Sequence, residues 1–130
     1  MVEIIYINTT KRTQLIDITS QVGEAVRKSN IKDGVCMVYV PHTTAAVTIN
    51  ENADPNVRED IINILNQIVP WQYDYKHLEG NSPAHIKATL IGPSVTIFIE
   101  NTHLSLGTWQ GIFFCEFDGP RSRRVLVKVF

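Results

Sequence analysis

Hydrophobic and polar residues alternate along most of this chain with a period of two, which is typical of half-buried strands. The alternation predicts strands at residues 2–8, 14–19, 35–41, 45–50, 94–101, 111–118 and 122–130. A period of about 3.6 residues predicts helices at residues 20–29, 54–70 and 82–92. Because strands dominate and do not alternate regularly with helices, we expect an α+β fold with mixed or antiparallel sheets and two to three short helices. A length of 130 residues fits a single domain, residues 1–130.

Two of the predicted helices begin with the same signal, a polar residue followed by proline. Asp54 and Pro55 fit the N-cap and the first helical position of one helix, and Ser82 and Pro83 fit those of the other. The predicted buried stripes are Val57, Ile61, Leu65 and Ile68 in the 54–70 helix, and Val22, Ala25 and Val26 in the 20–29 helix.

The charge balance and the cysteines limit the partners and the compartment. The chain has 12 Lys and Arg against 13 Asp and Glu, a net charge of −1. Nucleic-acid binders normally carry a basic surplus, so we expect no nucleic-acid partner. No stretch reaches the roughly 20 apolar residues of a membrane span, and residues 1–7 do not resemble a secretory signal. We therefore expect no membrane partner and a cytoplasmic protein, in which Cys36 and Cys115 are buried apolar residues.

Three histidines are the first candidates for chemistry. His42 ends a strand on its apolar face, His77 lies in the polar loop between two helices, and His85 lies in the first turn of the 82–92 helix. Imidazoles are common zinc ligands, and the start of a helix attracts anions. The spacing of these histidines fits no standard metal motif, so they are either metal or anion ligands or structural residues.

Carboxylates and one aromatic residue are further candidates with two interpretations each. Glu51 falls on the apolar side of the strand at 45–50, where a carboxylate needs a partner. Asp54 could serve the site, although helix capping explains it fully. Trp109 is either part of the core or a ring on which a planar substrate stacks.

The hairpin near residue 120 carries acidic residues on one arm and arginines on the other. Glu116 and Asp118 precede the turn, and Arg121, Arg123 and Arg124 follow it. This pattern is either an ion-pair network or a phosphate clamp beside carboxylates that hold a divalent ion, because arginine binds phosphate bidentately. The two interpretations are compatible.

Four segments together resemble a known family, the secondary thiamine-phosphate synthases. The segments are residues 42–46, 50–55, 79–87 and 107–124, and they occur in the expected order. The resemblance implies a compact α+β sandwich, a homotrimer, and a metal or an oxyanion at the histidines. The implied site contains His42, His77, His85, Asn81, Glu51, Asp54, Glu116 and Arg121.

The resemblance also implies a reaction, as a weak or secondary activity of thiamine biosynthesis. A transferase of this kind joins hydroxymethylpyrimidine diphosphate to thiazole phosphate, a phosphorylated small molecule, and releases pyrophosphate. A divalent metal, zinc or magnesium, together with arginine would neutralise the pyrophosphate. The predicted roles are metal binding by His42, His77 and His85, catalysis by His85, Glu51, Asp54 and Glu116, and ligand binding by Arg121, Arg123, Asn81 and Trp109. The alternatives are a metal-dependent hydrolase and a non-catalytic protein that binds a metal or a phosphorylated metabolite.

Overall fold

The computed structural model describes residues 2–130, which form two antiparallel sheets and three helices. The strands are β1 (Val2–Asn8), β2 (Gln14–Asp17), β3 (Gly34–Tyr39), β4 (Ala45–Glu51), β5 (Ser94–Glu100), β6 (His103–Leu104), β7 (Gln110–Glu116) and β8 (Ser122–Val129). The helices are α1 (Thr19–Ser29), α2 (Pro55–Ile68) and α3 (Ser82–Ile91). The predicted α+β fold is confirmed. The short β6 was not predicted, because two residues are too few to show an alternating pattern.

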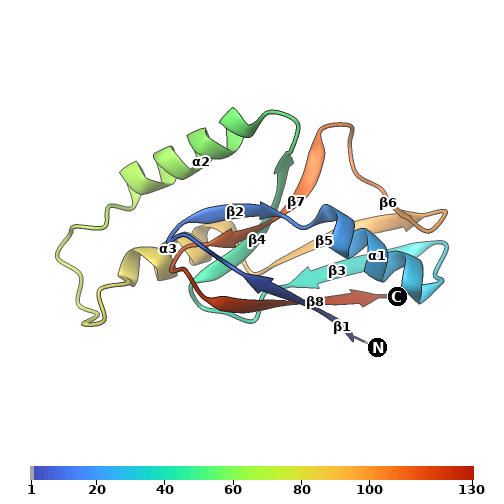
Figure 1. Ribbon diagram of the computed structural model, residues 1–130, viewed down its shortest axis with the longest axis horizontal. Helices are drawn as coiled ribbons and strands as arrows, with labels where there is room; N and C mark the ends of the chain where they lie inside the picture. The colour runs from blue at the N-terminus through green and yellow to red at the C-terminus, as the bar shows by residue number, and fades with distance from the viewer. Residues whose placement is uncertain (1) are drawn as a thin grey trace.

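The two sheets pack face to face and enclose the main core. The large sheet has the strand order β1-β8-β3-β5-β6, and the small sheet has the order β2-β7-β4. Helix α1 packs on the same inner face of the large sheet, beside the small sheet (Figure 1). Its predicted stripe of Val22, Ala25 and Val26 is buried there, which confirms the helical periodicity. Alternate residues of the strands supply the rest of this core, including Val38, Ile97, Val127, Val47, Ile112 and Phe114.

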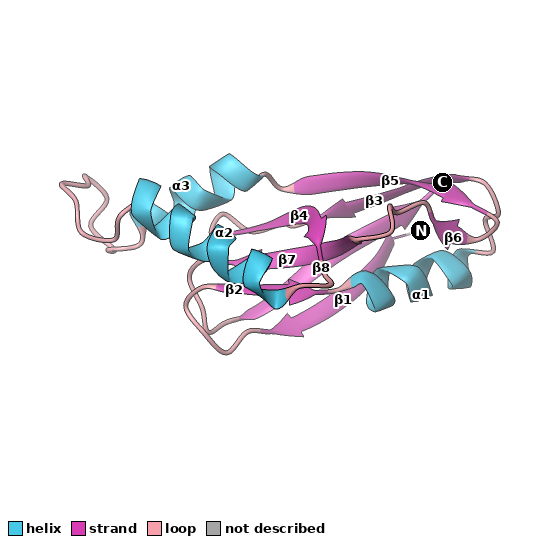
Figure 2. Cartoon of the chain, turned by 90° about the horizontal axis from the view of Figure 1, so that it is seen from above, coloured by secondary structure: helices cyan, strands magenta, loops and turns pink. Residues whose placement is uncertain are grey.

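A second, smaller core lies on the opposite face of the small sheet. Helices α2 and α3 lie beside β4 and β7 (Figure 2), and Leu65 and Ala84 pack against the sheet from them. The sheet contributes the other side of the alternating pattern, which is Leu15, Ala46, Phe113, Cys115 and Phe117. The small sheet is thus covered on both faces.

Two details of the helices differ from the prediction. Of the predicted stripe of α2 only Leu65 is buried, while Val57 and Ile61 are half-buried. Ile68 is 62% exposed, because the last turn of α2 faces the Tyr73 side of the following loop instead of the sheet. Helix α3 begins at Ser82 itself, and its N-cap is Asn81, whose side chain makes no capping hydrogen bond. The prediction at Asp54 is confirmed, since its carboxylate accepts the N–H of Asn56 at 2.9 Å.

The outer face of the large sheet is left open. Its exposed apolar side chains come from three strands of the sheet and are Val2, Ile4, Tyr6, Met37, Tyr39 and Phe98. Tyr6 and Phe98 are 78% and 70% exposed, whereas a contiguous apolar patch on a protein surface is usually covered by a partner. Within residues 2–130, no helix is both long and apolar enough to cross a membrane.

Candidate functional site

A polar pocket of about 480 Å³ opens where the β3–β4 loop, the loop before α3 and the β7–β8 turn meet. We call it the histidine pocket, because His42, His77 and His85 all line it. Asn81, Arg121 and Arg123 line it as well, so most of the ligand-binding residues predicted from the sequence lie together. A concave surface on which polar groups converge is a candidate small-molecule site.

A buried ion pair forms the floor of this pocket and bridges the two sheets. Glu116 of β7 is fully buried, and Arg123 of β8 has a side chain only 5% exposed. Arg123 donates from Nε to Oε1 of Glu116 at 2.8 Å and from Nη2 to Oε2 of the same carboxylate. Burial alone would raise the pKa of the Glu116 carboxyl, but the hydrogen bonds from Arg123 and its neighbours outweigh burial and lower it. The ion-pair interpretation of the hairpin is therefore correct at this position.

Two threonines complete the ion pair, and neither was among the predicted site residues, although Thr44 lies in the segment 42–46. Thr9 donates from Oγ1 to Glu116 at 2.7 Å across 107 residues of chain. Thr44 accepts at Oγ1 from Nη2 of Arg123 at 2.8 Å. Only the packing of the β1–β2 turn and the β3–β4 loop against the same strand ends brings these hydroxyls together.

The rim of the pocket is held by a second set of polar contacts. Asp118 accepts from Nη2 of Arg121 and from Nδ2 of Asn81, both at 2.9 Å and both at Oδ2. Asn81 therefore uses its side chain to tie α3 to the β7–β8 turn, which explains why it does not cap the helix. Because the carboxylate can only accept, the amide of Asn81 is fixed with its nitrogen toward Asp118.

The three histidines have different surroundings. His42 accepts the backbone N–H of Arg124 at Nε2, at 3.1 Å. His77 and His85 pack edge to face with ring centroids 5.4 Å apart, and Nε2 of His77 is 3.9 Å from a carboxylate oxygen of Glu79. Within residues 2–130, no group of three or more His, Cys, Asp or Glu side chains is placed to hold a metal ion. The predicted metal site at His42, His77 and His85 is thus not supported, since these three side chains do not form such a group.

Three predicted site residues lie elsewhere. In the small sheet Ala45 pairs with Glu116, whereas Glu51 at the other end of β4 pairs with Gln110. A strand of this length separates its ends by roughly 20 Å. Asp54 caps α2 beyond that far end, and Trp109 is 63% exposed beside it. Within one chain, none of these three lines the histidine pocket.

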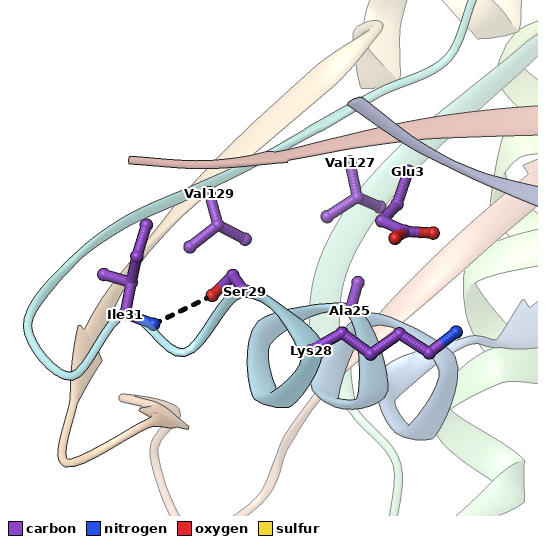
Figure 3. A pocket seen from close by; sticks show the side chains of 7 residues that line it. All are labelled: Glu3, Ala25, Lys28, Ser29, Ile31, Val127 and Val129. Carbon is purple, nitrogen blue, oxygen red and sulfur yellow. Dashed lines mark hydrogen bonds between the residues drawn. The ribbon is translucent and has the colours of Figure 1, made fainter. Parts of the chain in front are cut away.

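A second hollow, of about 250 Å³, lies between α1 and the inner face of the large sheet. Figure 3 shows Val127 and Val129 of β8 on one side of this hollow and Ala25, Lys28 and Ser29 of α1 on the other. This hollow is smaller, its lining mixes apolar groups with Glu3, Lys28 and Ser29, and it has neither the arginines nor the histidines of the histidine pocket. We therefore place the candidate site at the histidine pocket.

Comparisons with known proteins identify relatives over the whole chain. Residues 3–130 match the family model described as "UPF0047 protein YjbQ-like". A UPF0047 protein of Methanocaldococcus jannaschii is 56% identical over 95% of this chain and 89% of its own length. The UPF0047 protein YugU of Bacillus subtilis is 46% identical over 99% of this chain and 98% of its own length.

Solved structures agree with the sequence relatives. A crystal structure of an uncharacterized conserved protein of the YjbQ/UPF0047 family from Clostridium acetobutylicum has a TM-score of 0.97 and 55% identity, covering 98% of this chain and 99% of that one. A YbjQ-like protein of unknown function from Sulfolobus solfataricus has a TM-score of 0.95 and 36% identity, covering 99% of this chain and 95% of that one.

These relatives correct the resemblance inferred from the sequence motifs. The prediction of a secondary thiamine-phosphate synthase was wrong, because the matching family model and these relatives are named for UPF0047 or YjbQ and not for thiamine phosphate. A transferase of thiamine biosynthesis is therefore not supported, and the relatives' names give no support to a metal-dependent hydrolase either. On the match of residues 3–130, the chain belongs to the YjbQ/UPF0047 family.

Proposed function

We propose that this protein binds a small phosphate-bearing molecule in the histidine pocket. The observation that supports this most strongly is the presence of two arginines whose guanidinium groups are fixed by carboxylates yet keep donors free. Arg121 uses Nε and Nη2 on Asp118, and Arg123 uses Nε and Nη2 on Glu116 and Thr44. Within residues 2–130, Nη1 of neither arginine takes part in a hydrogen bond.

Both arginines that carry these free donors line the histidine pocket. Arg123 is buried as a residue, but its unbonded Nη1 atom keeps some accessible surface. Arg123 is also one of the residues that line the pocket. Arg121 is half exposed at the rim. A guanidinium held in place loses little freedom when it binds, and two such groups suit the several oxygens of a phosphate. Helix α3 begins at the same wall, and the start of a helix favours anions.

The catalytic role predicted for several residues stays a prediction, with the geometry favouring some over others. His85 and His77 lie in the pocket and are the acid–base groups available to a bound phosphate ester. Glu116 is fully engaged by hydrogen bonds, so it serves the pocket by holding Arg123 in place. Glu51, Asp54 and Trp109 would need a second chain to reach the ligand.

Equilibrium binding of inorganic phosphate and methyl phosphate tests this proposal. We expect Arg121→Met to weaken binding by roughly tenfold or more, because it removes a charge-assisted contact. Arg27→Met is the matched control, since Arg27 forms the same type of exposed pair, with Glu24 three residues earlier. Absence of binding in the unaltered protein, or equal affinities for the two variants, would refute the proposal.

We also propose that copies of this chain associate through the open face of the large sheet, and the predicted homotrimer is the assembly we expect. The support is the row of exposed apolar side chains on that face, which water otherwise covers. Light scattering should give three times the chain mass of 14.7 kDa. Phe98→Asp should lower that mass, and Leu78→Asp, in an exposed loop away from the sheet, should not. A monomer in the unaltered protein would refute this proposal.

The remaining expectations on surroundings and cofactor stay predictions. They are the cytoplasmic location, the absence of nucleic-acid and membrane partners, and a divalent cofactor, zinc or magnesium. Metal analysis of the purified protein, with and without methyl phosphate, checks the last of these.

A further inference from the structure

The side chain of His42 replaces a backbone partner that β3 no longer supplies. Strand β3 pairs with β8 up to Tyr39, which lies opposite Leu126. The same register, continued for two residues, would put Pro41 opposite Arg124, but β3 has ended by then. The N–H of Arg124 donates instead to Nε2 of His42 at 3.1 Å.

This hydrogen bond fixes the tautomer of His42. A backbone N–H can only donate, so the nitrogen that it meets must carry no proton. A neutral imidazole then has its single proton on Nδ1. Burial, followed by the positive charge of Arg123, lowers the pKa of His42 below its usual value, which favours this neutral form.

The Nδ1 atom of His42 is accessible and has no partner in the described part of the chain. It makes no hydrogen bond within residues 2–130, yet it is not fully buried. Since His42 lines the histidine pocket, the free N–H is available to a ligand there. The charged and titratable groups around it are Glu116, Arg123 and Arg124 on the strands, Asp118 and Arg121 at the turn, and His77, Glu79 and His85 on the loop and α3.

We infer that His42 donates Nδ1–H to an oxygen of a phosphate monoester dianion while its Nε2 stays bound to the Arg124 amide. This inference rests on the proposed function and names the ionic form of the ligand. A dianionic phosphate offers only acceptors, and the free atoms of His42, Arg121 and Arg123 offer only donors. The histidine needs no additional proton to bind, so its contribution persists above pH 7.

Two substitutions separate the ligand contact of His42 from its structural contact. Asparagine at position 42 places an N–H near the position of Nδ1 but has no acceptor for the Arg124 amide. Glutamine reaches the position of Nε2 with an acceptor but places no donor where Nδ1 lies. We expect His42→Gln to keep the unfolding midpoint and to weaken methyl phosphate binding roughly tenfold or more. His42→Asn should lose stability and keep affinity within a few-fold.

The affinity ratio between the unaltered protein and His42→Gln gives the protonation state. It should stay constant between pH 6.5 and 8.5, whichever way His77 and His85 change the absolute affinities. A ratio that falls toward one at high pH would mean that a charged imidazolium is the donor, and would overturn the inference. Equal affinities for His42→Gln and the unaltered protein would overturn it as well.

A spectroscopic measurement covers the case in which His42→Asn fails to fold. Nitrogen-15 shifts of His42 in the unaltered, ligand-free protein report which ring nitrogen carries the proton. A proton on Nδ1 supports the inference, and a proton on Nε2 overturns it. If the unaltered protein does not bind methyl phosphate at all, the proposed function fails and the inference fails with it. If the unaltered protein binds methyl phosphate but His42→Gln does not change the affinity, the inference alone fails.

Discussion

Removing the charge of Glu116 should cost this protein a large part of its stability. The carboxylate is fully buried and faces an arginine whose side chain is only 5% exposed. Glu116→Gln keeps the shape of the side chain but leaves the charge of Arg123 without a counter-charge. Loss of one partner from a buried ion pair costs about 3–5 kcal/mol.

The expected change in thermal midpoint follows from the size of the domain. A chain of 130 residues has an unfolding entropy of about 0.27 kcal/mol/K, so a loss of about 4 kcal/mol lowers the midpoint by about 15 °C. The measurement is thermal and urea unfolding at one fixed protein concentration, because self-association would otherwise change the apparent stability. Glu24→Gln is the control, since its partner Arg27 is exposed and we expect no measurable change.

A double variant distinguishes lost pairing from lost packing. In Glu116→Gln combined with Arg123→Met both charges are gone, so no unpaired charge is left between the sheets. We expect this double variant to be at least as stable as Glu116→Gln alone. Costs that simply add would show that the pair has no coupling, and the reasoning would be refuted.

The remaining predictions concern acid, thiols and one tight turn. Because the pKa of Glu116 is lowered in the folded state, its contribution to stability is present above its unfolded pKa of about 4.5 and is lost as the pH falls through the folded value. When the pH is lowered from 4.5, the urea midpoint of the unaltered protein should therefore decrease more steeply than that of Glu116→Gln. Burial raises the pKa of Cys36 to about 11 and that of Cys115 to about 12, so neither thiol should react with a thiol reagent at pH 8 until urea unfolds the chain, and rapid reaction in the native state would contradict this. Gly119→Ala would put a Cβ 2.2 Å from the carbonyl oxygen of Lys11, so we expect a marked loss of stability in the same unfolding assay, and an unchanged midpoint would contradict the packing of this turn.

Much of the fold could be predicted from the sequence because its determinants are local. Alternation placed Glu116 on the same face as Ile112 and Phe114, and all three side chains are buried between the sheets. The N-cap at Asp54 was predictable for the same reason, since the residue, the proline after it and the amide it binds are neighbours in sequence.

The candidate site could be predicted only in part, because it depends on which strand ends meet. His42 and Glu51 are close in sequence, yet β4 runs its full length between them and carries Glu51 to the other end of the small sheet. Thr9 is distant in sequence from Glu116, yet it donates to that carboxylate. No periodicity reports such distances, so a site assembled from neighbouring motifs included residues that the fold keeps apart.

The pairing of β1 with β8 has a consequence for how the chain folds. The register joins Val2 to Lys128 and continues to Asn8 and Ser122, so β1 finds this partner only once β8 has been synthesised. Contacts between such distant segments form slowly, because a long loop must close before they give any stability. Until then the apolar side chains of Ile4 and Tyr6 stay on an unpaired strand that can pair with other chains. The large sheet can therefore close only after β8 has been synthesised.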